Sequence, residues 1–155
     1  MSDLLFRDAT RDDVPAIIDF QLAMARETED LDLDREILTK GVNALFTDPS
    51  LGRYYIADYI ADVKGRAVGS LMITYEWSDW RNGMVWWIQS VYVHPEYRRR
   101  GIYAGLYAHI KKIVEPDPSV RGIRLYVDNR NASAQQVYAR LGMEGEHYRV
   151  FEWMK

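Results

Sequence analysis

The 155-residue sequence lacks several features that would mark particular classes of protein. It has no cysteine, which excludes a disulfide framework, a thiolate metal site and a cysteine nucleophile. No segment approaches the roughly 18 apolar residues that a membrane helix requires. The start, Met1-Ser2-Asp3-Leu4, has neither the basic residues nor the apolar core of a signal peptide. We therefore expect a soluble cytoplasmic protein without a metal site or a membrane partner.

An excess of basic residues is also absent. The chain has 20 Lys and Arg against 23 Asp and Glu, which gives a formal net charge of -3. Such a surface does not attract nucleic acid as a whole, so a nucleic-acid-binding function is disfavoured. The one dense basic run, Arg98-Arg99-Arg100, is a local feature that needs a local explanation.

The rest of the composition is that of a globular chain. Hydrophobic residues make up 48% and charged residues 28%. No repeat, low-complexity tract or linker divides the sequence, and its length is usual for one compact domain. We expect a single domain over residues 1–155.

Two helices are predicted in the first third of the chain. Thr10 and Asp13 form a box-like N-terminal cap. Apolar residues then recur at helical spacing from Val14 to Ala25, and only Gln21 interrupts them. Residues 27–36 carry six acidic side chains and lead into a second helix.

Strands and further helices are predicted in the rest of the chain. The strand over 84–93 is apolar nearly throughout, as expected of a strand buried on both faces. Mixed element order with three consecutive strands predicts an α+β fold, with a mixed sheet and helices on its faces. The other expected elements are strands at 4–7, 53–60 and 67–75, a turn near Gly65, a polar loop at 76–83, a helix from Gly101, a strand at 123–127, a helix from Asn131 to Gly142, and a final strand at 147–154.

The most informative stretch joins a buried strand to a helix through Arg98-Arg99-Arg100-Gly101. The first amides of a helix have no partner within it and lie at the positive end of its dipole. A phosphate satisfies both conditions, glycine leaves space for its oxygens, and arginines add charge. A phosphate cradle is therefore favoured over a solvated basic helix start. Neither G-x-x-x-x-G-K-[ST] nor G-x-G-x-x-G occurs, so an NTPase loop and a dinucleotide fold are unsupported.

Two motifs carry a resemblance to a known family. The segment from Val91 to Gly101 resembles the signature region of the GNAT superfamily of N-acetyltransferases, [RQ]-x-x-G-x-[GA] after a valine-rich strand. Arg98 and Gly101 match its first two fixed positions, whereas Tyr103 stands where a small residue is usual. The second match, to N-x-x-A-x-x-x-Y-x-x-x-G-[FM], consists of Asn131, Ala134, Tyr138, Gly142 and Met143.

The resemblance implies a fold and a cofactor. The fold is the acyl-CoA N-acyltransferase sandwich of three layers, with a mixed, mostly antiparallel sheet whose central strand pair splays apart at Val93 and Val127. Acetyl-CoA would lie in that gap, with its diphosphate on the N–H groups from Arg99 to Ala104 and its pantetheine arm against Val91, Val93 and Asn131. The implied cofactor site comprises Val91, Tyr92, Val93, Arg98, Arg99, Arg100, Gly101, Ile102, Tyr103, Ala104, Asn131 and Tyr138.

Acyl transfer from sulfur to an amine sets three tasks: the amine must lose a proton, the thioester carbonyl must be polarised, and the leaving thiolate must be protonated. A thiol has a pKa of about 8.5 and a tyrosine about 10, so a closely placed tyrosine can serve as the acid. The matched motif assigns this role to Tyr138, against the plainer alternative of a core aromatic.

The general base is left open. Many relatives have a glutamate on the central strand, but Gln89 occupies the corresponding place and cannot accept a full proton at neutral pH. A water relay or an already deprotonated substrate would also suffice. Glu76 is the first candidate, and the alternatives are Asp79, Glu27, Glu29 and His94.

The acceptor site of GNAT relatives is built by segments that correspond here to 27–36 and to 76–83. Carboxylates attract an ammonium group, and indole faces can hold one by cation–π contact. We therefore expect a small cationic amine or a peptide amine as substrate, although a solvated acidic face and plain tryptophan packing stay open. The expected acceptor residues are Glu27, Trp77, Trp80 and Gln89.

Two classes of function fit these observations. The expected one is direct transfer of an acetyl group from acetyl-CoA to an amine. The alternative is a non-catalytic CoA-binding sensor or interaction module of the same fold, which Gln89 favours and Tyr138 disfavours. A homodimer is expected from the habit of the family and from the aromatic content.

Overall fold

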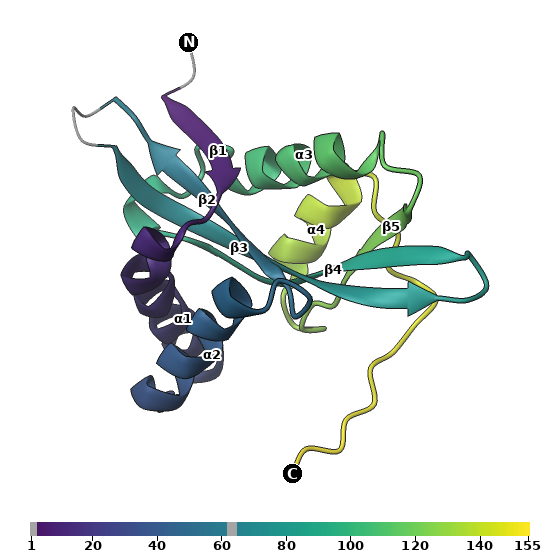
Figure 1. Cartoon of the computed structure of the whole chain (residues 1–155), viewed down its shortest axis with the longest axis horizontal. Helices are drawn as coiled ribbons and strands as arrows, with labels where there is room; N and C mark the ends of the chain where they lie inside the picture. Colours follow the sequence, from purple (N-terminus) through teal and green to yellow (C-terminus); the bar gives the residue numbers. More distant parts are fainter. Residues whose placement is uncertain (1–2, 62–64) are drawn as a thin grey trace. The chain divides into compact units, whose positions relative to one another are not determined.

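Figure 1 shows the computed structural model, which describes residues 3–61 and 65–155. The chain forms two compact units, residues 1–124 and 125–155. The predicted turn near Gly65 lies partly outside the described residues. The helices and strands from β1 to β5 are β1 (Leu4–Asp8), α1 (Val14–Glu29), α2 (Arg35–Thr47), β2 (Arg53–Tyr59), β3 (Arg66–Ser78), β4 (Gly83–Val93), α3 (Ile102–Val114) and β5 (Val120–Leu125).

The sheet has the strand order β1-β2-β3-β4-β5. Strands β1 to β4 pair antiparallel with their neighbours, whereas β4 connects to β5 through α3, a type of crossover that joins parallel strands. The predicted α+β class with a mixed sheet is confirmed. None of the helices in the described part of the chain is both long and apolar enough to cross a membrane.

The hairpin of β3 and β4 is longer than predicted. Glu76 pairs with Val85 and Ser78 pairs with Gly83, so the polar loop expected over 76–83 shrinks to the residues between the two strands. The reason is that cross-strand pairing outweighs the polar composition of this segment. Trp77 is consequently a strand residue, and Trp80 lies at the tip of the hairpin.

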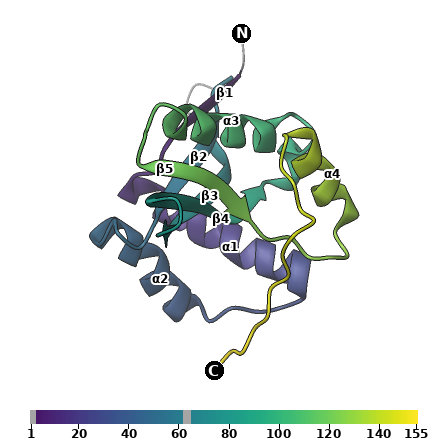
Figure 2. The ribbon, with the colours of Figure 1, turned by 90° about the vertical axis from the view of Figure 1, so that its right-hand side faces the viewer.

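Helices α1 and α2 cover one face of the sheet (Figures 1 and 2). The polar exception in the apolar stripe of α1, Gln21, donates a hydrogen bond to Ser90 Oγ in β4 at 3.0 Å. It thereby satisfies a half-buried hydroxyl on the sheet. The buried cluster beneath the two helices consists of Val14, Ile17, Ile18, Val42, Tyr54 and Ile56.

Helix α3 lies on the opposite face of the sheet (Figures 1 and 2). Two glycines allow its close approach. A methyl group at Gly69 of β3 would lie 3.2 Å from Ile102 Cγ2, and one at Gly105 would overlap the ring of Phe6 in β1. The N-terminus of α3 is therefore held on the sheet, shortly after the end of β4.

Arg7 in β1 fixes the chain just before α1. Its guanidinium donates to both oxygens of Asp13 at 2.8 Å, and its Nε donates to Asp58 at 2.6 Å. Asp13 also accepts from the N–H of Thr10 at 2.7 Å, which confirms the predicted cap. Burial alone would raise the pKa of Asp13, but the hydrogen bonds from Arg7 and Thr10 outweigh it and lower that pKa below its ordinary value of 3.8.

The C-terminal unit contains helix α4 (Ala132–Arg140). Asn131 caps it by accepting from the N–H of Ala134 at 3.1 Å, and Gly142 follows its end with a φ of 84°. Both ends agree with the predicted helix. The strand predicted over 147–154 is wrong, because these residues form neither helix nor strand. An alternating pattern cannot reveal whether an adjacent strand exists to pair with it.

Strand β5 also differs from its prediction, since it covers Val120–Leu125 rather than 123–127. It begins early because Ser119 O, just before it, already accepts from the N–H of Met84 at 2.8 Å. Beyond the strand, Asp128 accepts from the N–H of Arg130 at 2.8 Å. This local side-chain turn competes with a longer strand.

Candidate active site

The arginine loop, residues 98–104, connects β4 to the first turn of α3. A short 3₁₀ helix, Pro95–Tyr97, precedes it. The backbone is left-handed at Arg99 (φ 63°) and at Gly101 (φ 76°) but not at the residue between them. Backbones in which left-handed residues alternate with others form anion-binding concavities from successive N–H groups. The loop therefore has the conformation expected of a phosphate cradle.

The first turn of α3 leaves its amides without helical acceptors. The first bond of the helix runs from the N–H of Gly105 to the carbonyl of Gly101 at 2.9 Å, so Ile102, Tyr103 and Ala104 precede it. No side chain of the described residues caps this end, and a methyl group built at Gly101 meets nothing within 4 Å. The helix start therefore has amides without acceptors inside the helix and an open approach at Gly101, which fits a diphosphate group.

The three arginines of the loop differ in their contacts. Arg98 donates through Nε to Val93 O at 3.0 Å and through Nη2 to Glu27 Oε2 at 2.7 Å. Arg100 lies over the ring of Tyr97, with its Cζ 5.1 Å from the centroid. Arg99 is exposed. Arg98 thus holds the loop to neighbouring elements, while the charge of Arg99 is accessible to an anion.

Strand β4 is irregular at Gln89. Met72 of β3 pairs with Ser90 and Ile73 pairs with Ile88, so Gln89 is an extra residue in a β-bulge. Its Nε2 donates to Thr74 Oγ1 at 2.7 Å. Bulges are frequent beside active sites because they redirect side chains and backbone groups. No glycine or proline marks this position, so the bulge could not be predicted from the local sequence.

Glu76 accepts hydrogen bonds from two other side chains of the sheet. Its Oε1 accepts from Nη1 of Arg124 at 2.8 Å, and its Oε2 accepts from Nε1 of Trp87 at 3.3 Å. To accept a substrate proton, the carboxylate would have to weaken the ion pair with Arg124. Arg124 was not anticipated as its partner, since nothing in the sequence links β3 with β5.

The other base candidates lie apart from one another. Asp79, in the hairpin turn, accepts from the N–H of Trp80 at 2.8 Å. His94 accepts through Nδ1 from the N–H of Glu96 at 3.3 Å, and its ring packs edge-on against Tyr97. Glu29 is the last, exposed residue of α1. The geometry therefore distinguishes no single base.

The sequence profile of the Acetyltransferase (GNAT) family matches residues 14–143. The chain belongs to the GNAT family. Membership makes it an acyltransferase enzyme, in agreement with the cradle at the start of α3. A comparison with curated proteins gave no match.

Solved structures share the fold. A possible acetyltransferase from Clostridium difficile 630 is 42% identical, with 98% of this chain and 97% of that chain covered and a TM-score of 0.89. An aminoglycoside acetyltransferase from an uncultured soil metagenomic sample, in complex with sisomicin, is 17% identical (98% and 97% covered, TM-score 0.72). The aminoglycoside N-acetyltransferase AAC(6')-Iy, in complex with CoA, is 16% identical (98% and 94% covered, TM-score 0.75).

The expected acceptor residues of this GNAT chain have different surroundings. Trp80 at the hairpin tip is 93% exposed and Trp77 is 59% exposed. Trp86, in contrast, is buried against Tyr75, with ring centroids 5.6 Å apart. Exposed indoles offer faces to a ligand, whereas Trp86 belongs to the packing of the sheet.

The two motif residues Tyr138 and Asn131 lie in the C-terminal unit. Tyr138 is half-buried on α4, and its carbonyl accepts from the N–H of Met143 at 3.0 Å. The side-chain oxygen of Asn131 caps α4. Their roles towards the cofactor stay predictions.

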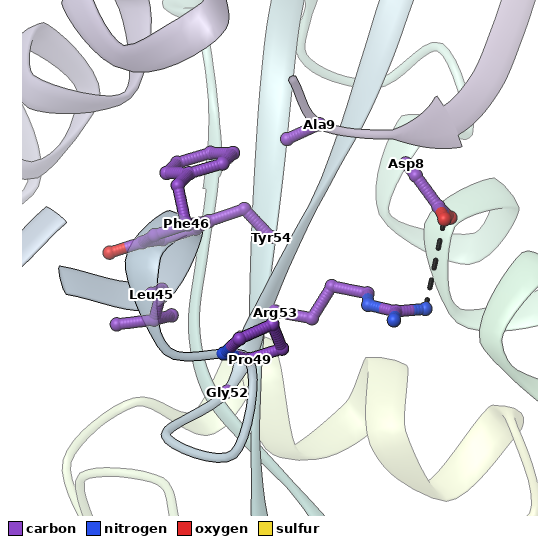
Figure 3. Close-up of a pocket in the computed structure, with 8 residues that line it drawn as sticks. All are labelled: Asp8, Ala9, Leu45, Phe46, Pro49, Gly52, Arg53 and Tyr54. Atoms are coloured by element: carbon purple, nitrogen blue, oxygen red, sulfur yellow. Dashed lines mark ion pairs between the residues drawn. The ribbon is translucent and has the colours of Figure 1, made fainter. Parts of the chain in front are cut away.

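A separate hollow of about 220 Å³ lies between the end of α2 and the start of β2 (Figure 3). Its lining includes Leu45, Phe46 and Tyr54 as well as an ion pair between Asp8 and Arg53 at 3.7 Å. None of the predicted site residues lines it, so nothing connects it with acyl transfer.

Proposed function

We propose that this GNAT protein is an N-acetyltransferase, which moves the acetyl group of acetyl-CoA directly to a primary amine. The observation that carries the proposal is the backbone before α3, which is left-handed at Arg99 and Gly101, with an open approach at Gly101 and the exposed charge of Arg99. These residues suit a diphosphate, the most strongly charged part of the linkage in coenzyme A.

Acetyl-CoA supplies the acetyl group as a thioester. In the proposal, the amides of Arg99 to Ala104 bind the diphosphate, and the backbone of Val91 and Val93 aligns the pantetheine arm. Tyr138 donates a proton to the departing sulfur, and Asn131 contacts the arm through its amide nitrogen, because its oxygen already caps α4. Glu76 stays the first base candidate, at the cost of its contact with Arg124.

The acceptor is proposed to be a cationic small molecule or a peptide amine. Trp77 and Trp80 present exposed indole faces on the β3–β4 hairpin, and residues 29–36 add carboxylates. Both features attract an ammonium group. Gln89, in the bulge of β4, is placed on the acceptor side as a hydrogen-bonding residue. We also infer that the protein works as a single domain in a homodimer, without nucleic acid or membrane as partner.

The second candidate, a CoA-binding module without catalysis, is favoured by one observation. The carboxylate of Glu76 is tied to Arg124 and Trp87, and Gln89 supplies no base. Such a module would keep the arginine loop and bind coenzyme A but would not release it from acetyl-CoA.

The decisive experiment combines calorimetry with a panel of amines. Coenzyme A binding is measured for the wild type, for Gly101→Asp and for Gly101→Asn. Asparagine and aspartate adopt the left-handed backbone more readily than other side chains and fill the same space, but only the aspartate places a negative charge at the cradle. We therefore expect Gly101→Asp to bind at least about tenfold more weakly than Gly101→Asn.

Acetyl transfer is then followed as free thiol with polyamines, aminoglycosides and peptides. Because the protein has no cysteine, every thiol detected comes from released coenzyme A. Absence of coenzyme A binding by the wild type would refute the proposed function. Binding without thiol release from any amine would favour the non-catalytic module.

A further inference from the structure

Glu27, near the end of α1, contacts the arginine loop. Its Oε2 accepts from Arg98 Nη2 at 2.7 Å, and its Oε1 accepts from the hydroxyl of Tyr92 at 3.0 Å. Arg98 is held from a second side, since its Nε donates to Val93 O at 3.0 Å. Its guanidinium also lies 5.5 Å from the ring centroid of Tyr92. We call Glu27, Tyr92 and Arg98 the α1–loop clamp.

The clamp connects three elements that are distant in sequence. Glu27 belongs to α1, Tyr92 to β4, and Arg98 is the first residue of the arginine loop. Arg98 is therefore fixed both to the last residue of β4 and to α1. The chain has only a few residues between Arg98 and the first amides of α3, so the position of Arg98 restricts where those amides can lie.

The protonation states of Glu27 and Tyr92 support the α1–loop clamp. The hydrogen bond from Arg98 lowers the pKa of Glu27, and the bond from Tyr92 lowers it further. Burial and the neighbouring Glu27 raise the pKa of Tyr92, which keeps its hydroxyl protonated as a donor. Glu27 is thus an ionised carboxylate whose two oxygens are both engaged, and an acceptor ammonium would have to compete with Arg98 for it.

We propose that Glu27 is a positioning residue for the cofactor: through Arg98 it sets the arginine loop for diphosphate binding, and it is not part of the acceptor site. This inference rests on the proposed function. It moves Glu27 from the expected acceptor residues to the donor side and leaves the acceptor carboxylates to residues 29–36.

A double-mutant cycle tests the clamp in the full-length protein. Glu27→Gln and Arg98→Met each remove one charge of the pair while keeping most of the side-chain volume, and the double variant removes both charges. Glu115→Gln is the matched control, because it removes the same charge outside the acidic segment and the arginine loop and breaks only the exposed pair with Lys111. Tyr92→Phe, which deletes one hydroxyl, serves as a milder second probe.

The clamp predicts a specific pattern of constants. Glu27→Gln and Arg98→Met should each raise the Kd of coenzyme A and the KM of acetyl-CoA about three- to tenfold, since the pair is partly exposed. The double variant should bind coenzyme A no more weakly than whichever single variant binds it more weakly. The KM of the amine and kcat at saturating acetyl-CoA should stay within about twofold of the Glu115→Gln values.

Three outcomes would overturn the inference. Equal binding of coenzyme A to Glu27→Gln and Glu115→Gln would show that the clamp does not position the loop. A rise in the KM of the amine on Glu27→Gln, also in the Arg98→Met background, would return Glu27 to the acceptor site. Failure of the wild type to bind coenzyme A would remove the proposed function and this inference together, whereas the first two outcomes leave the proposed function standing.

Discussion

At the scale of the residue, Tyr138 tests the proposed chemistry most directly. Replacing it with phenylalanine removes the proton donor but keeps the ring, so we expect kcat to fall at least about tenfold while the Kd of coenzyme A changes little. Steady-state kinetics and calorimetry measure the two quantities. Tyr148→Phe, at an exposed position of the same unit, is the control. Unchanged turnover in Tyr138→Phe would remove this residue from the mechanism.

Asp13 is a second residue with a measurable role, in stability rather than catalysis. Asp13→Asn should lower the free energy of unfolding at pH 7 by about 1–3 kcal/mol, because the half-buried Arg7 loses one of its two carboxylate partners. Urea unfolding measures the difference, with the exposed Asp12→Asn as control.

The effect of Asp13 depends on pH in a definite direction. Its pKa is lowered in the folded protein, so its contribution is complete above the ordinary value of 3.8 and is lost as the pH falls through the folded value. The stability curves of wild type and Asp13→Asn should therefore converge in acid. Curves that stay parallel down to the lowest measurable pH would contradict the assigned ion pair.

At the scale of the element, the two glycines inside helices provide a paired prediction. Gly105→Ala in α3 forces a methyl group into the ring of Phe6 and should destabilise by about 1–3 kcal/mol. Gly41→Ala in α2 meets nothing within 4 Å and should stabilise by about 0.5–1 kcal/mol through helix propensity. The midpoints of urea unfolding measure the stability of both variants against the wild type. Equal effects of the two substitutions would mean that α3 does not pack closely on β1.

Elements with a local cause could be predicted from the sequence. The helix after Thr10 followed from its cap and apolar spacing, and the long strand before the arginine loop followed from its apolar run. The Gln89 bulge, the length of the β3–β4 hairpin and the absence of the final strand could not be predicted. Each depends on which distant segment pairs with the strand in question, and that information is not contained in a local pattern.

The same distinction between local and distant causes holds for the residues of the candidate site. The arginine loop was recognisable because its function depends on neighbouring residues: a strand end, a glycine and a helix start. The partners of Glu27 and Glu76 were not recognisable, because Arg98 and Arg124 lie 71 and 48 residues further along the chain. Gln21 differs from them: as a polar residue in an apolar stripe, it indicated a distant contact, which is its hydrogen bond to Ser90.

At the scale of the whole molecule, the proposed single domain makes residues 1–124 and 125–155 unfold together. Hydrogen exchange in rising urea should then show the amides of α4 and those of the β2–β4 sheet converging on one opening free energy. Mass spectrometry of peptic fragments resolves the two regions. If α4 exchanged at low urea while the sheet stayed protected, the chain would behave as two separately unfolding units.

The clamp between α1 and the arginine loop also matters for any attempt to change the proposed choice of amine. The end of α1 adjoins the acidic segment 29–36, so a mutagenesis library aimed at new acceptors would naturally include position 27. Variants selected at position 27 with saturating acetyl-CoA would depend on the acetyl-CoA concentration in a way that the selection does not detect. Selection at scarce acetyl-CoA would keep Glu27 and steer specificity changes towards the β3–β4 hairpin.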